Sequence, residues 1–261
     1  EVAMTEPLLV VEGLNVGFPS KAGVVQAVSD VSFELHAGEV LAVVGESGSG
    51  KSVTALTLMR LHAKSTRISG RAVFEGRDLL TLSDRDMRSV RGNDIAMIFQ
   101  DPISSLNPRR RVRDSVLDPL DIWNLGTASE RAERVDRVLE EVGIDPRRAH
   151  ASRPHEFSGG QCQRIAIARA LVLDPTLIIC DEPVSALDVS IQAQIVNLLR
   201  DLQKKLKLSL IFIAHDLSVV KHISDRVMVM YLGRGMEVAD QGALYHRPLH
   251  PYTSALVKSV P

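Results

Sequence analysis

The sequence predicts an α/β fold with a mostly parallel sheet at its core, an antiparallel β subdomain at the N-terminal end and an inserted helical subdomain. Short apolar runs that alternate with helical segments read as buried strands of a parallel sheet covered on both faces: 40–44, 95–99, 177–180 and 208–214. The first forty residues instead alternate apolar and polar positions, which is typical of half-exposed antiparallel strands. Between residues 101 and 157 no strand pattern occurs, and this segment predicts the helical insertion.

Composition limits the classes of protein to which the chain can belong. Its 261 residues are 45% hydrophobic, which suffices for a substantial core. Lys and Arg number 31 against 32 Asp and Glu, a net charge of −1 that gives no general attraction to nucleic acid. No apolar run approaches the ~20 residues that span a bilayer, and the N-terminal residues lack a signal-peptide pattern, so we expect a cytoplasmic location. Cys162 and Cys180 have no partner at metal-ligand spacing, and we expect both to be small buried residues of a reduced protein.

The elements follow in chain order. In the first half, Val31–Leu35 alternates as a strand, and further elements are expected at 40–44 (strand), 53–59 (helix), 72–74 (strand), from about 83 (helix) and 95–99 (strand). Within the insertion, Thr127 and Glu130 form a capping-box pattern that opens a helix; its apolar positions are Val135, Val138, Leu139 and Val142. In the second half we expect helices at 161–173, 189–206 and near 217, strands at 177–180 and 208–214, and a hairpin of two strands at 227–230 and 235–238.

A glycine loop between the strand 40–44 and the next helix predicts a phosphate site. It has the pattern G-x-x-x-x-G-K-S: Gly45, Glu46, Ser47, Gly48, Ser49, Gly50, Lys51 and Ser52. Glycine permits backbone angles that turn successive N–H groups toward phosphate oxygens, and the helix N-terminus adds partial positive charge. Lys51 can reach the outer phosphates and the Ser52 hydroxyl can bind Mg²⁺. With both flanks correct, a nucleoside triphosphate site is favoured over a plain glycine-rich turn.

Two acidic residues follow the buried strand 177–180. In a doubly wound sheet, Asp181 and Glu182 would lie beside the phosphate loop. Asp181 can then hold the Mg²⁺ hydration shell, and Glu182 can accept a proton from an attacking water. The alternative is that Asp-Glu-Pro only caps the next element.

A second helix start can also bind an anion. Ser158, Gly159, Gly160 and Gln161 follow Phe157 and open a helix, so a serine cap and exposed N–H groups are placed together. An ordinary capped helix is a serious alternative for such a short pattern. Taken with the phosphate loop, however, the chain has two candidate phosphate-binding helix starts.

Six motifs in this order resemble the nucleotide-binding subunit of an ATP-binding-cassette (ABC) transporter, over about residues 8–261: the phosphate loop, Gln100, residues 157–161, Asp181-Glu182, residues 185–188 and His215. The resemblance implies a phosphate-loop (RecA-like) core at 6–100 and 158–261, with the helical subdomain at about 101–157, in one domain of residues 6–261. It implies ATP and Mg²⁺ as cofactors and a second nucleotide-binding domain, identical or different, as partner.

The resemblance also implies a role for each site residue. Catalytic roles fall to Lys51, Gln100, Glu182 and His215, and the metal to Ser52, Gln100 and Asp181. ATP would contact the phosphate loop, Val53 and, through its adenine, Phe18. In this family two domains face head to tail, so that the helix start of one closes on ATP held by the other; the residues concerned are Ser158, Gly159, Gly160, Gln161 and Asp188.

Three segments are similar to one branch of the family, the oligopeptide and dipeptide importer ATPases: 45–53, 100–108 and 250–256. This finer resemblance implies uptake of peptides or a related small solute, and a peripheral position on the cytoplasmic face of the cell membrane. The implied partners are two integral membrane permease subunits and an extracytoplasmic substrate-binding protein, with no nucleic acid. The alternatives are a non-transport ABC ATPase acting on nucleic acid or ribosomes, and a phosphate-loop kinase, which leaves the Ser158–Gly160 site unexplained.

Overall fold

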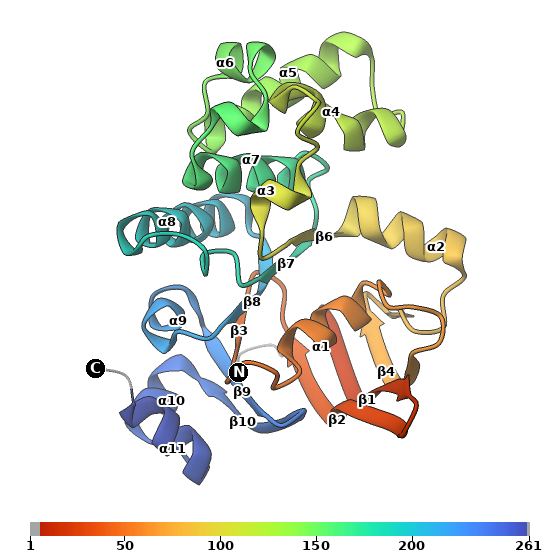
Figure 1. Ribbon diagram of the computed structural model, residues 1–261, viewed down its shortest axis with the longest axis vertical. Helices are drawn as coiled ribbons and strands as arrows, with labels where there is room; N and C mark the ends of the chain where they lie inside the picture. The colour runs from red at the N-terminus through yellow and green to blue at the C-terminus, as the bar shows by residue number, and fades with distance from the viewer. Residues whose placement is uncertain (1–5, 260–261) are drawn as a thin grey trace.

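The computed structural model describes residues 6–259, which fold into two sheets with a group of helices beyond them (Figure 1). Residues 260–261 of the predicted domain lie outside the described residues. The smaller sheet is antiparallel, with strand order β2-β1-β4-β5; its strands are β1 (Leu9–Ser20), β2 (Gly23–Leu35), β4 (Arg67–Phe74) and β5 (Arg77–Asp78). The predicted antiparallel subdomain is confirmed, although β1 and β2 are longer than the alternating stretches suggested.

The larger sheet has the order β10-β9-β3-β8-β7-β6 and is parallel except for β10. Its strands are β3 (Val40–Val44), β6 (Ile95–Ile98), β7 (Leu177–Asp181), β8 (Ser209–Ala214), β9 (Arg226–Tyr231) and β10 (Arg234–Asp240). Every residue of β3, β7 and β8 is buried, as the uninterrupted apolar runs predicted. Because these strands are parallel, their carboxyl ends meet at one edge of the sheet.

Helices cover both faces of this sheet. Alternate residues of β3 enter two different cores: Val40, Ala42 and Val44 pack in one, Leu41 and Val43 in the other. The helices outside the insertion are α1 (Lys51–Leu58), α2 (Asp84–Ser89), the π-helix η1 (Val90–Asp94), α7 (Gly159–Leu171), α8 (Val189–Leu206), α9 (Leu217–Ile223), α10 (Gln241–His246) and α11 (Pro251–Lys258). The last two helices were not expected from the sequence. No helix in residues 6–259 has the length and apolar character needed to cross a membrane.

The described elements between residues 101 and 157 are all helical: α3 (Pro102–Ser105), α4 (Val112–Ile122), α5 (Ala128–Glu141), α6 (Pro146–Ala151) and the 3₁₀ turn η2 (Pro154–Glu156). The capping box of Thr127 and Glu130 forms as predicted, and the four apolar positions expected on this helix and at its end are buried. Helix α7 contacts α3, α4 and α5 on one side and β6 and α8 on the other. It therefore joins the helical group at the top of Figure 1 to the sheet below.

Candidate nucleotide site

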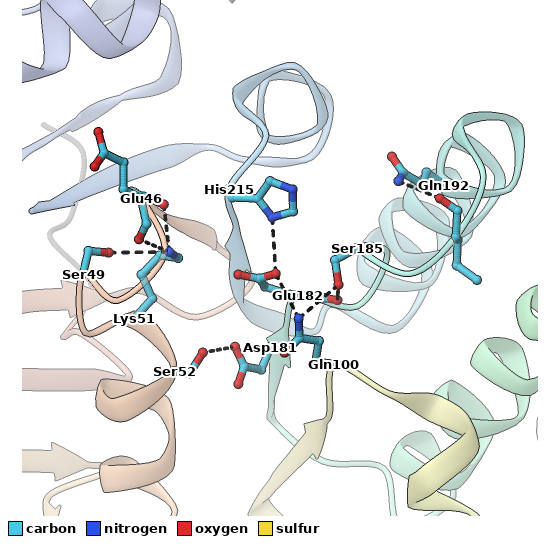
Figure 2. Close-up of polar contacts among 12 residues, drawn as sticks. Glu46, Ser49, Lys51, Ser52, Gln100, Asp181, Glu182, Ser185, Gln192 and His215 are labelled. Carbon is cyan, nitrogen blue, oxygen red and sulfur yellow. Dashed lines mark hydrogen bonds and ion pairs between the residues drawn. The ribbon is translucent and has the colours of Figure 1, made fainter.

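The phosphate loop and the predicted residues Gln100, Asp181, Glu182 and His215 gather where four parallel strands end. Gly45 follows β3, Gln100 comes shortly after β6, Asp181 ends β7 and His215 follows β8. Figure 2 shows Gln100 and His215 turned toward Glu182, and Asp181 turned toward Ser52. The doubly wound order thus brings together residues that are far apart in the chain.

A cavity of about 490 Å³ opens at this edge. Its lining is Ala27, Ser47, Gly48, Ser49, Gly50, Lys51, Ser52, Val53, Gln100, Glu182 and His215. Its volume lies within the range of small-ligand pockets. Sequence reasoning missed Ala27, because a small residue in a long hairpin strand carries no signal of a binding role.

The phosphate loop needs glycine for two reasons at its first and sixth positions. Gly45 and Gly50 have φ of 155° and 96°, which side-chain-bearing residues rarely adopt. A Cβ on Gly45 would also lie 2.2 Å from the carbonyl oxygen of Met230, and one on Gly50 would lie 2.7 Å from that of Ala27. The loop is therefore pressed against neighbouring backbone, and the glycines allow this close approach.

Lys51 is buried within its own loop. Its Nζ donates hydrogen bonds to the carbonyl oxygens of Gly45 at 2.8 Å and Glu46 at 2.9 Å, and lies 3.5 Å from Ser49 Oγ (Figure 2). Burial lowers the pKa of Lys51, and the nearby acidic side chains oppose that shift. The ammonium group lies at the cavity wall, where phosphate oxygens can replace the carbonyl partners.

Ser52 and Asp181 are paired by a hydrogen bond of 2.8 Å from the Ser52 hydroxyl to Asp181 Oδ1. Burial raises the pKa of the Asp181 carboxyl, and the hydrogen bond from Ser52 partly opposes this. A hydroxyl and a carboxylate side by side are hard oxygen donors, which fit Mg²⁺ bound by one or two protein ligands with substrate phosphates and water. These two residues therefore suit the predicted metal.

Glu182 lies at the centre of the polar contacts. Its Oε2 is 3.2 Å from His215 Nδ1, and Gln100 Nε2 donates to the same oxygen at 3.4 Å. Its backbone has φ of 47°, a left-handed conformation that is uncommon outside glycine and tends to occur at functional sites. The Ser185 hydroxyl donates to the Glu182 carbonyl at 3.1 Å and lies 3.5 Å from Gln100 Nε2. Ser185 belongs to the motif of residues 185–188, and the structure adds it to this network.

The second predicted anion site lies elsewhere. Ser158 caps α7: its hydroxyl accepts from the Gln161 N–H at 3.3 Å, and Gln161 Oε1 accepts from the Ser158 N–H at 3.1 Å. Neither these residues nor Gly159, Gly160 and Asp188 line the cavity. Asp188 is exposed and precedes α8. Within one chain the two candidate phosphate-binding helix starts therefore do not form one site.

Phe18 is also absent from the cavity lining. Its ring packs edge-on against His62, with ring centroids 5.4 Å apart and an interplanar angle of 78°. Stacking of Phe18 on adenine stays a prediction that the lining residues do not support.

A phosphate loop, a core strand followed directly by the pair Asp181 and Glu182, and a helical insertion beside a mostly parallel sheet define an ATP-binding cassette. Residues 28–185 match the family model described as "ABC transporter". The chain belongs to this family and is an ABC-type ATPase.

Alignments with several relatives extend over most of the chain. It is 53% identical to the oligopeptide transport ATP-binding protein AppF of Bacillus subtilis, over 94% of this chain and 73% of that protein. It is 53% identical to OppF of Haemophilus influenzae, over 94% of this chain and 72% of the relative. A putative peptide import ATP-binding protein of Brucella ovis is 50% identical, over 99% of this chain and 80% of the relative.

Solved structures agree with the fold. The cassette MJ0796, as a post-hydrolysis dimer bound to ADP and phosphate, matches with a TM-score of 0.79 and 26% identity, over 89% of this chain and 98% of that one. The cassette cbiO1 from Clostridium perfringens matches with a TM-score of 0.78 and 30% identity, over 93% of this chain and 92% of that one. The predicted α/β class with a RecA-like core is confirmed.

Proposed function

We propose that this chain is the ATP-hydrolysing subunit of an importer that takes up peptides or a related small solute through separate membrane subunits. The observation that carries the proposal is the 50–53% identity to peptide-transport ATP-binding proteins over nearly the whole chain. These relatives favour an importer over an ABC ATPase that acts on nucleic acid or ribosomes. The net charge of −1 agrees, because it offers no general basic surface for nucleic acid.

Each group of site residues has a separate role in the hydrolysis of ATP. The loop from Gly45 to Ser52 holds the phosphates, with the charge of Lys51 directed at their oxygens. Mg²⁺, held by Ser52 and Asp181, would neutralise phosphate charge. Glu182 Oε2 takes a proton from the water that attacks the terminal phosphorus, and the bond to the ADP oxygen breaks.

Gln100 and His215 support that general base. Both have a nitrogen within 3.4 Å of Glu182 Oε2, so they fix the direction in which the carboxylate faces the cavity. His215 would also contact the terminal phosphate. Gln100 comes shortly after β6 and before the helical group, so it links the site to that group.

A second cassette would complete the site. Ser158 and Gly159 lie at a helix start outside their own cavity, yet they have the form of an anion site. In a head-to-tail pair each chain would present this helix start to the ATP of the other, with Asp188 at the contact. ATP binding would then close the pair, and hydrolysis with release of products would open it.

The permease would dock between the sheet and the helical insertion. A cavity of about 280 Å³ there is lined by residues from both parts, among them Phe99, Ile122 and Trp123. Ile122 is 76% exposed and Phe99 is 42% exposed, an apolar surface suited to a cytoplasmic helix of a membrane subunit. Such docking would place the chain on the cytoplasmic face of the membrane, with a substrate-binding protein on the opposite side.

Reconstitution tests the proposal. The chain, its partner cassette, the permease pair and the binding protein would be placed in lipid nanodiscs, and ATP hydrolysis measured with short peptides, nickel or free amino acids. We expect peptides delivered by the binding protein to stimulate hydrolysis. If nickel alone stimulates hydrolysis, the transported solute is not a peptide. If the chain assembles with no permease, the proposal that it belongs to an importer is refuted.

A further inference from the structure

The backbone of Glu182 is held in its left-handed conformation by three hydrogen bonds. Its N–H donates to the Ile213 carbonyl on β8 at 3.1 Å. Its own carbonyl accepts from the Ser185 N–H at 3.3 Å and from the Ser185 hydroxyl at 3.1 Å. A residue with a side chain persists at positive φ only where its surroundings hold it there. Ser185 supplies two of these three bonds and so supports the conformation of Glu182.

The Ser185 hydroxyl also meets the side chain of Gln100. Gln100 Nε2 donates to Ser185 Oγ at 3.5 Å and to Glu182 Oε2 at 3.4 Å. Both distances are long for hydrogen bonds, and contacts of catalytic groups often shorten when substrate binds. The contacts form a closed ring that runs from the Glu182 carbonyl through Ser185 and Gln100 to the carboxylate of the same Glu182 (Figure 2). Such a ring fixes the carboxylate relative to the backbone that carries it.

The chemistry of the hydroxyl decides which way the Gln100 amide faces. A hydroxyl has one proton to donate, and that of Ser185 goes to the Glu182 carbonyl. Toward Gln100 the hydroxyl can therefore only accept, so the amide must turn its NH₂ group to Ser185. The same NH₂ group then faces the Glu182 carboxylate, whereas the reversed amide would set its oxygen against Glu182 Oε2 and repel it.

Ser185 makes these contacts from outside the nucleotide cavity. Gln100 and Glu182 line the cavity of about 490 Å³, and Ser185 is not among its lining residues. Ser185 instead lines a separate cavity of about 40 Å³, together with Glu182 and His215. Any effect of the Ser185 hydroxyl on hydrolysis must therefore act through the residues that it holds.

We propose that Ser185 is a positioning residue for the general base. Its hydroxyl holds the Glu182 backbone and selects the orientation in which the Gln100 amide donates to the Glu182 carboxylate. The proposal rests on the proposed role of Glu182 in ATP hydrolysis and is independent of the transported solute. Loss of the hydroxyl should lower the rate of hydrolysis and leave nucleotide affinity unchanged, because binding depends on the phosphate loop.

The substitution Ser185→Ala tests the proposal. ATP hydrolysis would be measured in the reconstituted transporter, and ADP affinity on the purified chain. We expect kcat to fall about three- to tenfold, the effect of one hydrogen bond, while ADP affinity equals that of the wild type. Ser185→Thr keeps a hydroxyl and should restore the rate. Equal kcat in Ser185→Ala and the wild type would overturn the proposal, and so would an equal loss in the alanine and threonine variants.

Ser224→Ala is the matched control. Ser224 is also half-buried, and its hydroxyl donates to the Val220 carbonyl at 2.8 Å, at the end of α9. Its loss should lower the melting temperature and leave kcat as in the wild type. If Ser224→Ala lowers kcat as much as Ser185→Ala does, the loss in Ser185→Ala reflects reduced stability and the proposal fails.

A double-mutant cycle tests the action through Gln100. Ser185→Ala would be compared in the wild type and in Gln100→Ala, where there is no amide to orient. The loss of kcat should be smaller in the Gln100→Ala background, because one of the two effects of the hydroxyl is already gone. An equal loss in both backgrounds would overturn the orienting role of Ser185. If the wild-type transporter hydrolyses no ATP, the proposed function itself is refuted, and this inference with it.

Discussion

The hydroxyl of Ser52, at the start of α1, donates a hydrogen bond of 2.8 Å to Asp181, at the end of β7. This contact joins the phosphate loop to the acidic strand end, the two parts of the site that were predicted from separate motifs. It also sets two hard oxygen atoms side by side, which is the chemistry that Mg²⁺ requires.

Replacing Ser52 tests the metal directly. Ser52→Ala removes a hydroxyl ligand and the partner of Asp181, so we expect Mg²⁺-dependent ATP hydrolysis to fall at least about tenfold. Hydrolysis rates measured across a Mg²⁺ titration would check this. Ser52→Thr keeps a hydroxyl at the same position and should retain the wild-type Mg²⁺ dependence, whereas an unchanged titration for Ser52→Ala would refute the assignment.

Replacing Glu182 separates binding from chemistry. Glu182→Gln keeps the shape of the side chain but cannot accept the proton from water, so kcat should fall by about 10²–10⁴. ATP should still bind, and the ATP-bound pair of cassettes should persist longer in analytical ultracentrifugation. Glu133→Gln, an exposed site on α5, serves as the control. Undiminished turnover by Glu182→Gln would remove Glu182 as the base.

The parts that the sequence predicted well are those set by short-range pattern. The run of five apolar residues in β3, followed by glycine, favours a buried strand over a helix, and the glycine spacing after it predicts the loop. Glu182 could be placed beside that loop because parallel strands end at a common edge.

The parts that the sequence did not predict depend on distant contacts. Helix α11 has only eight residues, and its start is anchored by Glu237 on another element. Ala27 lines the cavity because β2, which pairs with β1, carries it to the phosphate loop beside Gly50. This contact joins residues that are far apart in the sequence. The position of Ser158 outside its own cavity followed from the family resemblance alone, because local sequence says nothing about a second chain.

A charge at the proposed permease surface should uncouple the subunits. Ile122 is 76% exposed at the groove between the sheet and the helices, and Ile122→Glu would place a carboxylate in an apolar contact. We expect the variant to bind ADP normally and to be lost from the complex when permease subunits are purified by affinity. Ile122→Leu keeps the apolar surface and should co-purify with the permease. If both variants co-purify with it, the permease docks at another surface.

The two cysteines should be inert in the folded chain. Cys162 and Cys180 are buried, and burial raises the pKa of Cys180 to about 12, so its thiol stays protonated at mildly alkaline pH. Iodoacetamide should therefore modify neither residue until guanidinium chloride unfolds the protein, as intact mass spectrometry would show. Labelling of the folded chain would contradict the expected structural role.

The ATP site proposed between two cassettes can be tested sharply, because it predicts a variant that binds nucleotide but does not hydrolyse ATP. Gly159 is the first residue of α7, and a Cβ there would meet Leu187 at 3.5 Å, an ordinary contact. Gly159→Asp is therefore compatible with the packing, and a carboxylate in the first turn suits the helix dipole. Across a pair of cassettes, however, that carboxylate would repel the terminal phosphate held by the other chain.

We expect Gly159→Asp to bind ADP within about twofold of the wild type, because its own cavity is untouched, and to lose ATP hydrolysis by at least about a hundredfold. The hundredfold figure corresponds to about 2.7 kcal/mol, within the reach of one misplaced charge in a water-poor site. Gly159→Ala adds the same Cβ without the charge and should keep much more of the rate. If the two variants hydrolyse ATP equally, charge at this helix start is irrelevant to the reaction; if Gly159→Asp loses ADP affinity as well, the residue acts on its own cavity and the shared site fails.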